Sequence, residues 1–243
     1  SAEIAKISDN KNDLGALENI NCDCICVSGF WTPTIHLASQ SGNKTKFDKN
    51  IDAFVPGVSK QNETTLGAAN GKFTLEETLK DSFDAGYELS KKITKNENKI
   101  LCPKVVEKKK TTHDKFWCVP LPKGKTYKRF LDFQNDVAVS DVEIAVKEGY
   151  RSIEHVKRYT TLGMATDQGK TSNLNGLQLV SNIENKIVPE VGHTTFRPPY
   201  TPVTIGAIVG REVGKHSRPT RKSPIHYWHE KNNAVFVDAG VWL

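Results

Sequence analysis

The sequence has no run of about 18 uninterrupted apolar residues, so a membrane-spanning protein is not expected. Its first residues lack the basic and apolar regions of a secretory signal, and cytoplasmic placement is expected. Aromatic residues are sparse, at 8%, and neither basic run, 104–115 or 211–222, interleaves aromatics with Lys and Arg. The net charge of +6 therefore favours solvated loops over a nucleic-acid surface.

Cysteine is also scarce, and its pattern suits a half-buried sheet better than a disulfide framework. There are five cysteines, an odd number, and three of them alternate in Cys22-Asp-Cys24-Ile-Cys26. Alternation predicts a strand over residues 20–28 with the thiols on one face. No second pair at zinc-ligand spacing follows. His226 and His229 lack an evident third ligand, so no metal site is expected.

Helix signals begin in the first hundred residues. Thr74 and Glu77 have capping-box spacing, and the apolar residues that follow predict a helix of about four turns. The turn before it, Gly67 to Gly71, would point backbone N–H groups outward at a phosphate or a ring carbonyl. An ordinary helix start without a ligand is the alternative.

The second half of the chain predicts a small helical unit. Ser140 and Glu143 have capping-box spacing for a helix to Lys147, and Ser152 is expected to cap the next helix. A third helix is predicted over residues 175–183. The proline-rich stretch 194–224 indicates an extended linker, and the alternating residues 234–243 indicate a strand.

Three segments are specific enough to carry a resemblance: Leu131 to Val137, Glu154 to Asn173, and Thr195 to Pro202. They closely resemble segments of the sarcosine oxidase α-subunit family, and the match extends over essentially the whole chain. The chain is accordingly expected to be a piece of a longer polypeptide.

The resemblance implies an α+β multidomain architecture. Residues 1–95 would be the end of an NAD/FAD-type dinucleotide-binding domain from a flavoprotein-like α/β fold with two such domains, followed by a connector, 96–130. Residues 131–193 would form a small helical domain like bacterioferritin-associated ferredoxin. Residues 194–243 would be a Pro-rich linker and the start of an aminomethyltransferase-like folate domain.

The resemblance also implies an NAD site on the glycine turn and the helix after it. Its candidate contacts are Gly67, Ala68, Gly71, Phe73, Thr74 and Leu75. The glycine-rich phosphate fingerprint of a dinucleotide fold, GxGxxG, is absent from the sequence. We therefore expect an incomplete site that binds NAD poorly.

Cluster-bearing members of the ferredoxin-like module use four cysteines. The matching positions here hold oxygen-bearing side chains: Asp132, Gln134, Asp167 and Ser172. Iron–sulfur clusters require thiolate ligands, so no cluster is expected.

A flavin mononucleotide (FMN) at the interface with the β subunit is a further implication. Cations and hydroxyls of the helical module could meet its phosphate, and the alternative is that they are surface or helix-terminal groups. The candidates are Lys157, Arg158, Thr160, Thr161, Lys170 and Thr171.

The implied activity is oxidation of the N-methyl group of sarcosine, giving glycine, hydrogen peroxide and, with tetrahydrofolate, 5,10-methylenetetrahydrofolate. The implied partners are β, γ and δ subunits; no catalytic residue is expected in this chain, and the piece alone should be inactive. The alternatives are a subunit of a related amine, proline or opine dehydrogenase, and a non-enzymatic basic interaction module.

Overall fold

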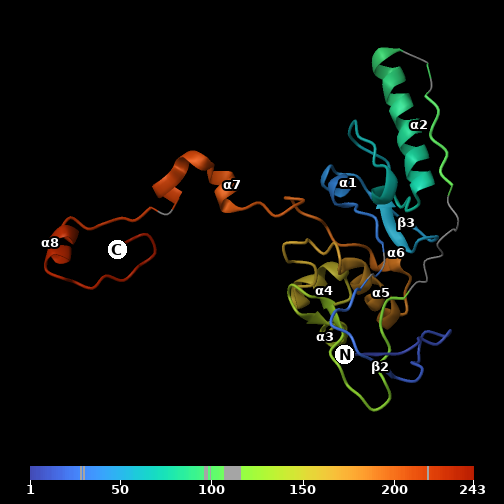
Figure 1. Cartoon of the computed structure of the whole chain (residues 1–243), viewed down its shortest axis with the longest axis horizontal. Helices are drawn as coiled ribbons and strands as arrows, with labels where there is room; N and C mark the ends of the chain where they lie inside the picture. Colours follow the sequence, from blue (N-terminus) through green and yellow to red (C-terminus); the bar gives the residue numbers. More distant parts are fainter. Residues whose placement is uncertain (28, 30, 96–97, 99, 107–115, 218) are drawn as a thin grey trace. The chain divides into compact units, whose positions relative to one another are not determined.

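The computed structural model describes residues 1–27, 29, 31–95, 98, 100–106, 116–217 and 219–243 (Figure 1). The chain divides into two compact units, Ser1–Tyr200 and Thr201–Leu243. None of the helices in these ranges is both long and apolar enough to cross a membrane.

The strands of the first unit form three antiparallel ribbons of two strands each. β1 (Ala2–Ile4) pairs with β2 (Glu18–Ile20), β3 (Thr45–Asp48) with β4 (Ala53–Pro56), and β5 (Phe130–Asp132) with β6 (Val137–Ala138). In the β3–β4 ribbon, Phe47 lies opposite Phe54, with the ring centroids 5.3 Å apart. β4 is fully buried, so this ribbon joins the core.

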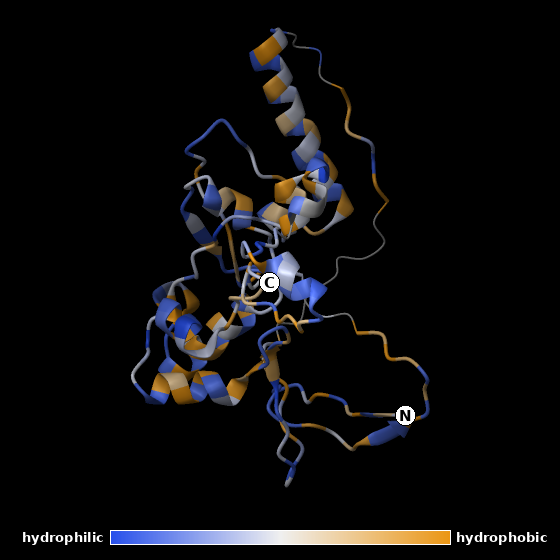
Figure 2. Ribbon diagram, turned by 90° about the vertical axis from the view of Figure 1, so that its left-hand side faces the viewer, coloured by the Kyte–Doolittle hydropathy of each residue, from blue (hydrophilic) through white to orange (hydrophobic). Residues whose placement is uncertain are grey.

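The predicted helix start at Thr74 is confirmed. A short helix, α1 (His36–Gln40), and a 3₁₀ turn, η1 (Gly67–Asn70), precede helix α2 (Leu75–Thr94). The Thr74 hydroxyl accepts the Glu77 amide at 3.2 Å and donates to the Glu77 carboxylate at 2.8 Å. α2 is longer than the four turns expected, and none of its residues is buried. Figure 2 shows its apolar and polar residues interspersed along an exposed helix.

The predicted helical unit is present as α3 (Val139–Lys147), α4 (Ile153–Thr160), α5 (Asn173–Glu184) and α6 (Val188–Val191). α3 contacts both α4 and α5. Five residues from these helices and the loop after α4 are fully shielded from solvent: Val142, Ala145, Val156, Leu162 and Val180. This apolar centre also includes Phe54 of β4, so residues before the connector complete the core of the helical unit.

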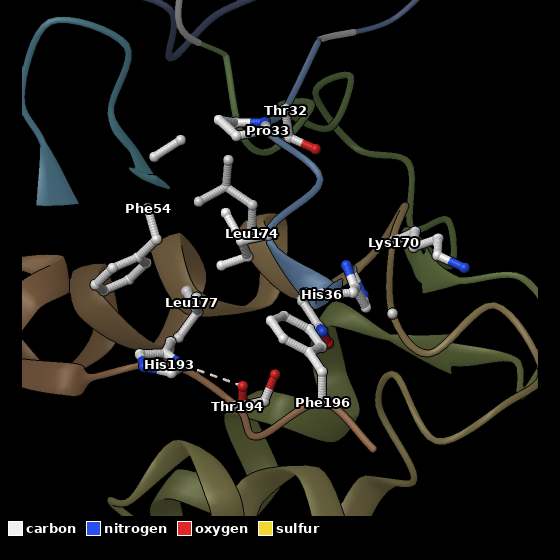
Figure 3. A pocket seen from close by; sticks show the side chains of 14 residues that line it. Thr32, Pro33, His36, Phe54, Lys170, Leu174, Leu177, His193, Thr194 and Phe196 are labelled. Atoms are coloured by element: carbon white, nitrogen blue, oxygen red, sulfur yellow. Dashed lines mark hydrogen bonds between the residues drawn. The ribbon is translucent and has the colours of Figure 1, made fainter. Parts of the chain in front are cut away.

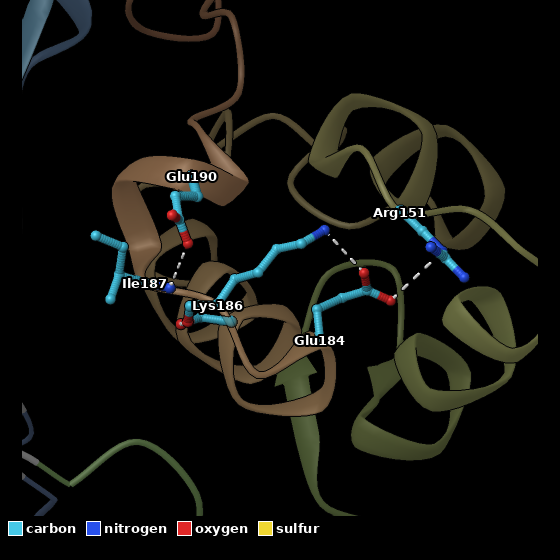
Figure 4. Close-up of polar contacts among 6 residues, drawn as sticks. Arg151, Glu184, Lys186, Ile187 and Glu190 are labelled. Atoms are coloured by element: carbon cyan, nitrogen blue, oxygen red, sulfur yellow. Dashed lines mark hydrogen bonds and ion pairs between the residues drawn. The ribbon is translucent and has the colours of Figure 1, made fainter.

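Polar contacts hold the ends of these helices (Figure 4). The Glu184 carboxylate at the end of α5 accepts from Lys186 at 3.0 Å and lies 3.9 Å from Arg151, just before α4. Glu190 accepts the backbone amide of Ile187 at 3.1 Å, which caps α6. Ion pairs at the surface stabilise by about 0–1 kcal/mol, so these contacts orient the helices more than they stabilise them.

Two capping predictions need correction. α3 begins directly after β6, so its cap is Ala138, whose amide donates to the Asp141 carboxylate at 2.8 Å, and Ser140 lies inside the helix. Ser152 does occupy the cap position of α4, but its side chain makes no capping hydrogen bond.

Both strand predictions from alternation are wrong. Only Glu18–Ile20 pairs near the cysteines, Cys22 is half-buried, and Cys24 and Cys26 are exposed, so the thiols do not line a buried face. Residues 234–243 form isolated bridges, such as Ala239 with Trp242, rather than a strand. Alternation produces a strand only where a neighbouring segment supplies a run of hydrogen bonds. Within the described ranges, Ile20 pairs only as the end of β2, and Trp242 forms only single bridges to Arg221 and Ala239.

The linker prediction for 194–224 also differs from the structure. Thr194 and Phe196 are buried in the first unit. In the second unit, α7 (Ile205–Val209) and the 3₁₀ segment η2 (Arg211–Ser217) are helical, because residues 203–218 contain no proline. α8 (His226–Lys231) follows, and the buried ring of His226 stacks on Phe236 with centroids 4.3 Å apart.

Candidate functional site

A narrow cavity of about 50 Å³ lies in the first unit where distant segments converge. Its walls come from residues 32–36 at the start of α1, from β4, from α5 with the preceding loop, and from residues 193–196 (Figure 3). Phe54, Leu177 and Phe196 make much of the wall apolar. The cavity thus joins parts of the chain that are more than 100 residues apart.

His36 is the buried polar side chain at the centre of this arrangement. It is 4% exposed, and its ring packs on Phe196 with centroids 3.8 Å apart. Nε2 lies 3.2 Å from the carbonyl oxygen of Gln168, an acceptor, so the geometry assigns the proton to Nε2 and leaves Nδ1 as an acceptor. Burial lowers the pKa of His36; the Gln168 carbonyl opposes this shift, and the charge of Lys170 adds to it.

Lowering the pH is expected to weaken the fold through His36. Its pKa in the folded state is below its ordinary 6.5, so the unfolded chain binds the proton more readily, and the free energy of unfolding falls as the pH drops below about 6.5. Urea unfolding at pH 7.5 and 5.5 measures how much the free energy of unfolding changes with pH. A His36→Gln variant should show a smaller change, and an equal change in that variant would contradict the role given to His36.

Asp132 anchors a second feature next to this cavity, the loop between α4 and α5. Its carboxylate is 2% exposed and accepts three backbone amides: Oδ1 from Gln134 at 2.9 Å and Asn135 at 3.2 Å, and Oδ2 from Gly163 at 2.8 Å. The side chain thereby joins β5 to the end of α4.

Two more of the four positions compared with cluster cysteines lie in the same network. The Gln134 side-chain oxygen accepts the Thr166 hydroxyl at 3.0 Å and the Asp167 amide at 3.4 Å. Ser172 sits at the start of α5, 1% exposed, with its hydroxyl unpartnered among the described residues. The structure therefore links Asp132, Gln134 and Asp167 by hydrogen bonds and leaves Ser172 outside them.

This donor set does not fit an iron–sulfur cluster. All four side chains offer oxygen, whereas clusters are held by thiolates, and the oxygens of Asp132 and Gln134 already accept backbone amides. Over the described ranges, no group of three or more His, Cys, Asp or Glu is arranged to hold a metal ion.

The residues expected to contact NAD lie together at η1 and the start of α2. Gly67 donates its amide to Asp81 of α2 at 3.3 Å, and the Thr74 hydroxyl caps the same helix. Gly71 has φ +77°, and a Cβ there would lie 2.8 Å from Ile51 Cδ1, so backbone conformation and packing favour glycine whether or not a ligand binds. Glu76 and Glu77 in the first turn disfavour a phosphate at this helix start.

The remaining three NAD candidates do not form a buried site. Ala68 and Leu75 are exposed and Phe73 is half-buried. NAD contact at this turn remains a prediction.

The six candidates for the FMN phosphate fall into two groups. One is at the C-terminal end of α4: Lys157, Arg158, Thr160 and Thr161. The other is on the loop before α5: Lys170 and Thr171.

Each group makes contacts within the chain. Lys157 donates to the Thr195 carbonyl at 3.3 Å, and burial lowers its pKa. Arg158 lies 3.9 Å from Glu154. Thr160 donates to the Val156 carbonyl at 2.7 Å, and Thr161 ends α4 in a left-handed conformation.

On the loop, Thr171 donates to Asp167 at 3.0 Å. The Lys170 ammonium donates to the Tyr200 carbonyl and lies 4.1 Å from the centroid of the Tyr200 ring. The C-terminal end of a helix carries partial negative charge, so the α4 group suits a phosphate less well than the loop group does. Phosphate contact remains a prediction.

Sequence reasoning missed His36 and Thr194, which line the cavity. His36 lies in an unremarkable Pro-Thr-Ile-His stretch, and its role depends on a loop 132 residues away. No local signal could have found it.

Comparisons with known proteins point in one direction. Residues 126–211 match the model of the sarcosine oxidase A3 domain. The chain is 40% identical over 94% of its length to sarcosine oxidase subunit alpha of Rhizobium meliloti, of which it covers 23%. It is 34% identical over 98% of its length to the corresponding subunit of Corynebacterium sp. strain P-1, of which it covers 25%.

The chain thus spans about a quarter of the length of the curated relatives it matches. Among solved structures, the L-proline dehydrogenase of P. horikoshii overlaps 74% of the chain and 37% of its own, at 21% identity and a TM-score of 0.42. The resemblance drawn from the three sequence segments is confirmed: along nearly its whole length, this chain is similar to sarcosine oxidase α subunits, and residues 126–211 match the model of their A3 domain.

Proposed function

We propose that this chain is part of the α subunit of a heterotetrameric sarcosine oxidase. The proposed enzyme oxidises the N-methyl group of sarcosine with dioxygen as electron acceptor, to give glycine, hydrogen peroxide and, with tetrahydrofolate, 5,10-methylenetetrahydrofolate. The observation that carries the proposal is the alignment of nearly the whole chain with proteins named sarcosine oxidase subunit alpha. The chain is one segment of that subunit and on its own has no activity.

Within the subunit, the helical unit acts as a structural adaptor. Asp132 supports this role, because its carboxylate accepts three backbone amides and offers oxygen where an iron–sulfur cluster requires thiolate. Iron and acid-labile sulfide analysis of the purified protein should accordingly give neither above background.

FMN, when bound at the interface with the β subunit, supplies the amine oxidation, and no residue of this chain is assigned to that chemistry. Lys170 and Thr171 suit its phosphate best among the candidates, because they lie on a loop rather than at a helix C-terminus. The NAD site is placed at 67–75, and the folate domain begins in 194–243. The γ and δ subunits complete the proposed assembly in the cytoplasm.

The flavin assignment is tested in the full α subunit expressed with β, γ and δ. Lys170→Glu should reduce FMN content per assembly and co-purification of β, because it reverses the charge facing the phosphate. Lys170→Met removes the charge but keeps an apolar stem against Tyr200, and it should show a smaller loss. Lys147→Glu, at an exposed position at the end of α3, is the matched control.

Thermal unfolding of the α subunit separates binding from folding. Normal FMN content in Lys170→Glu would remove the flavin role. If Lys170→Glu lowers both the FMN content and the melting temperature of the α subunit, Lys170 would instead be assigned to holding Tyr200.

A further inference from the structure

Helix α2 has an uncharged face that the described part of the chain leaves largely exposed. Four large apolar residues lie on this face at helical spacing: Leu79, Phe83, Leu89 and Ile93. The opposite face carries exposed charges such as Lys80 and Glu88. A helix patterned in this way normally buries its apolar stripe against another element, yet none of the 20 residues of α2 is buried.

The helix is attached to the first unit by its first turns. The Thr78 hydroxyl donates to the Lys72 carbonyl at 3.0 Å, and Asp81 accepts the Gly67 amide at 3.3 Å. Away from this attachment the apolar residues become more exposed, to 59% at Leu89 and 72% at Ile93. Because an isolated helix gains most of its stability from packing of its apolar face, the second half of α2 requires a cover.

Gly86 indicates where the cover comes closest. It lies in the interior of α2, where glycine is less favourable than alanine, and a Cβ there would meet nothing within 4 Å. Nothing in the described part of the chain therefore requires glycine at this position. A groove of about 350 Å³ passes over Gly86 and is lined on the helix by Ser82, Phe83 and Ser90 as well. The missing side chain lets a neighbouring segment approach the helix backbone.

The size of this face favours a cover from the same polypeptide. A helix of 20 residues is about 30 Å long and about 10 Å wide, so one face offers about 300 Å². Stable association of separate molecules buries about 800 Å² on each partner. A segment of the same chain needs less, because it does not lose the translational and rotational freedom of a second molecule.

The rest of the α subunit can supply this segment. The chain spans about a quarter of the α subunits that it matches, and α2 lies outside the residues matched by the A3 domain model, 126–211. We infer that the uncharged face of α2 packs against an apolar segment of the α subunit outside these 243 residues, with Gly86 at the closest approach. The inference rests on the proposal that the chain is part of that subunit, and it does not require the oxidase activity.

A photo-crosslinker identifies the occupant. Leu89 is replaced by benzoylphenylalanine in the full α subunit, which is expressed with β, γ and δ, and cross-linked peptides are identified by mass spectrometry. The expected product joins position 89 to an α-subunit peptide outside this chain and runs as a single α subunit on a denaturing gel. The same group at Glu88, on the charged face, is the matched control and should not give this product. A cross-link within these 243 residues, to a second α subunit or to another subunit, or no cross-link, would overturn the inference.

Gly86→Leu provides a second readout, because the direction of its effect depends on the cover. In the 243-residue chain the new side chain meets nothing and favours the helix, so the melting temperature should not fall. In the full α subunit it would collide with the packed segment, and the melting temperature should fall. Glu88→Leu, on the charged face, should lower it in neither protein. The same response to Gly86→Leu in both proteins would overturn the inference.

Sarcosine oxidation by the same assemblies separates this inference from the proposed function. An active assembly that lacks the expected cross-link would reject the packing of α2 and keep the proposed function. An inactive assembly with the expected cross-link would support the packing and count against the proposed function.

Discussion

Replacing Asp132 with alanine is expected to lower the free energy of unfolding by about 3–5 kcal/mol. The carboxylate is buried and accepts the amides of Gln134, Asn135 and Gly163. Without it, the buried amide of Gly163 and the partly buried amides of Gln134 and Asn135 lose their acceptor, and each lost bond to a charged group costs about 1.5–3 kcal/mol before relaxation and water entry recover part. Urea unfolding followed by circular dichroism gives the difference.

An Asp→Asn pair provides the matched comparison. Asp132→Asn keeps one acceptor oxygen and should cost about half as much as alanine. Asp136→Asn, four residues away and exposed, should change stability by less than about 0.5 kcal/mol, because Asn tolerates its φ of +53°. A cost below about 1 kcal/mol for Asp132→Ala would show that this carboxylate does not hold the loop.

Replacing Gly169 with alanine is expected to cost about 3 kcal/mol, for two separate reasons. Its φ is +70°, where a side chain adds about 1–2 kcal/mol of strain. A Cβ there would also lie 2.2 Å from Oδ1 of Asn173, a side chain that is 7% exposed and cannot swing away. Overpacking of this kind costs about 1–3 kcal/mol.

Gly149→Ala isolates the strain from the clash. Gly149 has φ +97°, and a Cβ there would meet nothing within 4 Å, so its replacement costs only the backbone strain. Thermal unfolding of the two variants should therefore differ by the cost of the clash. Asn173→Ala in the Gly169→Ala background should recover part of the loss; no recovery, or equal losses at the two glycines, would refute the packing argument.

Gly163 shows why this loop tolerates little change. Its Cβ would also fall 2.2 Å from the same Asn173 oxygen, and its amide is the one held by Asp132 Oδ2. The Asn173 side chain thus leaves no room for a Cβ at either glycine, and the Asp132 carboxylate also binds the amide of Gly163.

Local sequence signals predicted the elements whose stability is local. The cap at Thr74 satisfies an amide of its own helix, α2. The apolar spacing of α3, α4 and α5 shows which face each of these helices buries. All four helices could therefore be placed within a few residues. The same kind of signal failed for 20–28 and 234–243. A strand needs hydrogen bonds from another segment, and alternation cannot say whether that segment is present.

The sequence by itself determined the helices and the resemblance to the sarcosine oxidase α subunits, because each depends on residue identity or near-neighbour spacing. Tertiary structure alone decided that His36 meets the Gln168 carbonyl, that Thr194 is buried across the cavity from Leu177, and that Asp132 holds Gly163. Those residue pairs lie 17 to 132 positions apart in the sequence. Their geometry is set by how the core packs, which no stretch of neighbouring residues encodes.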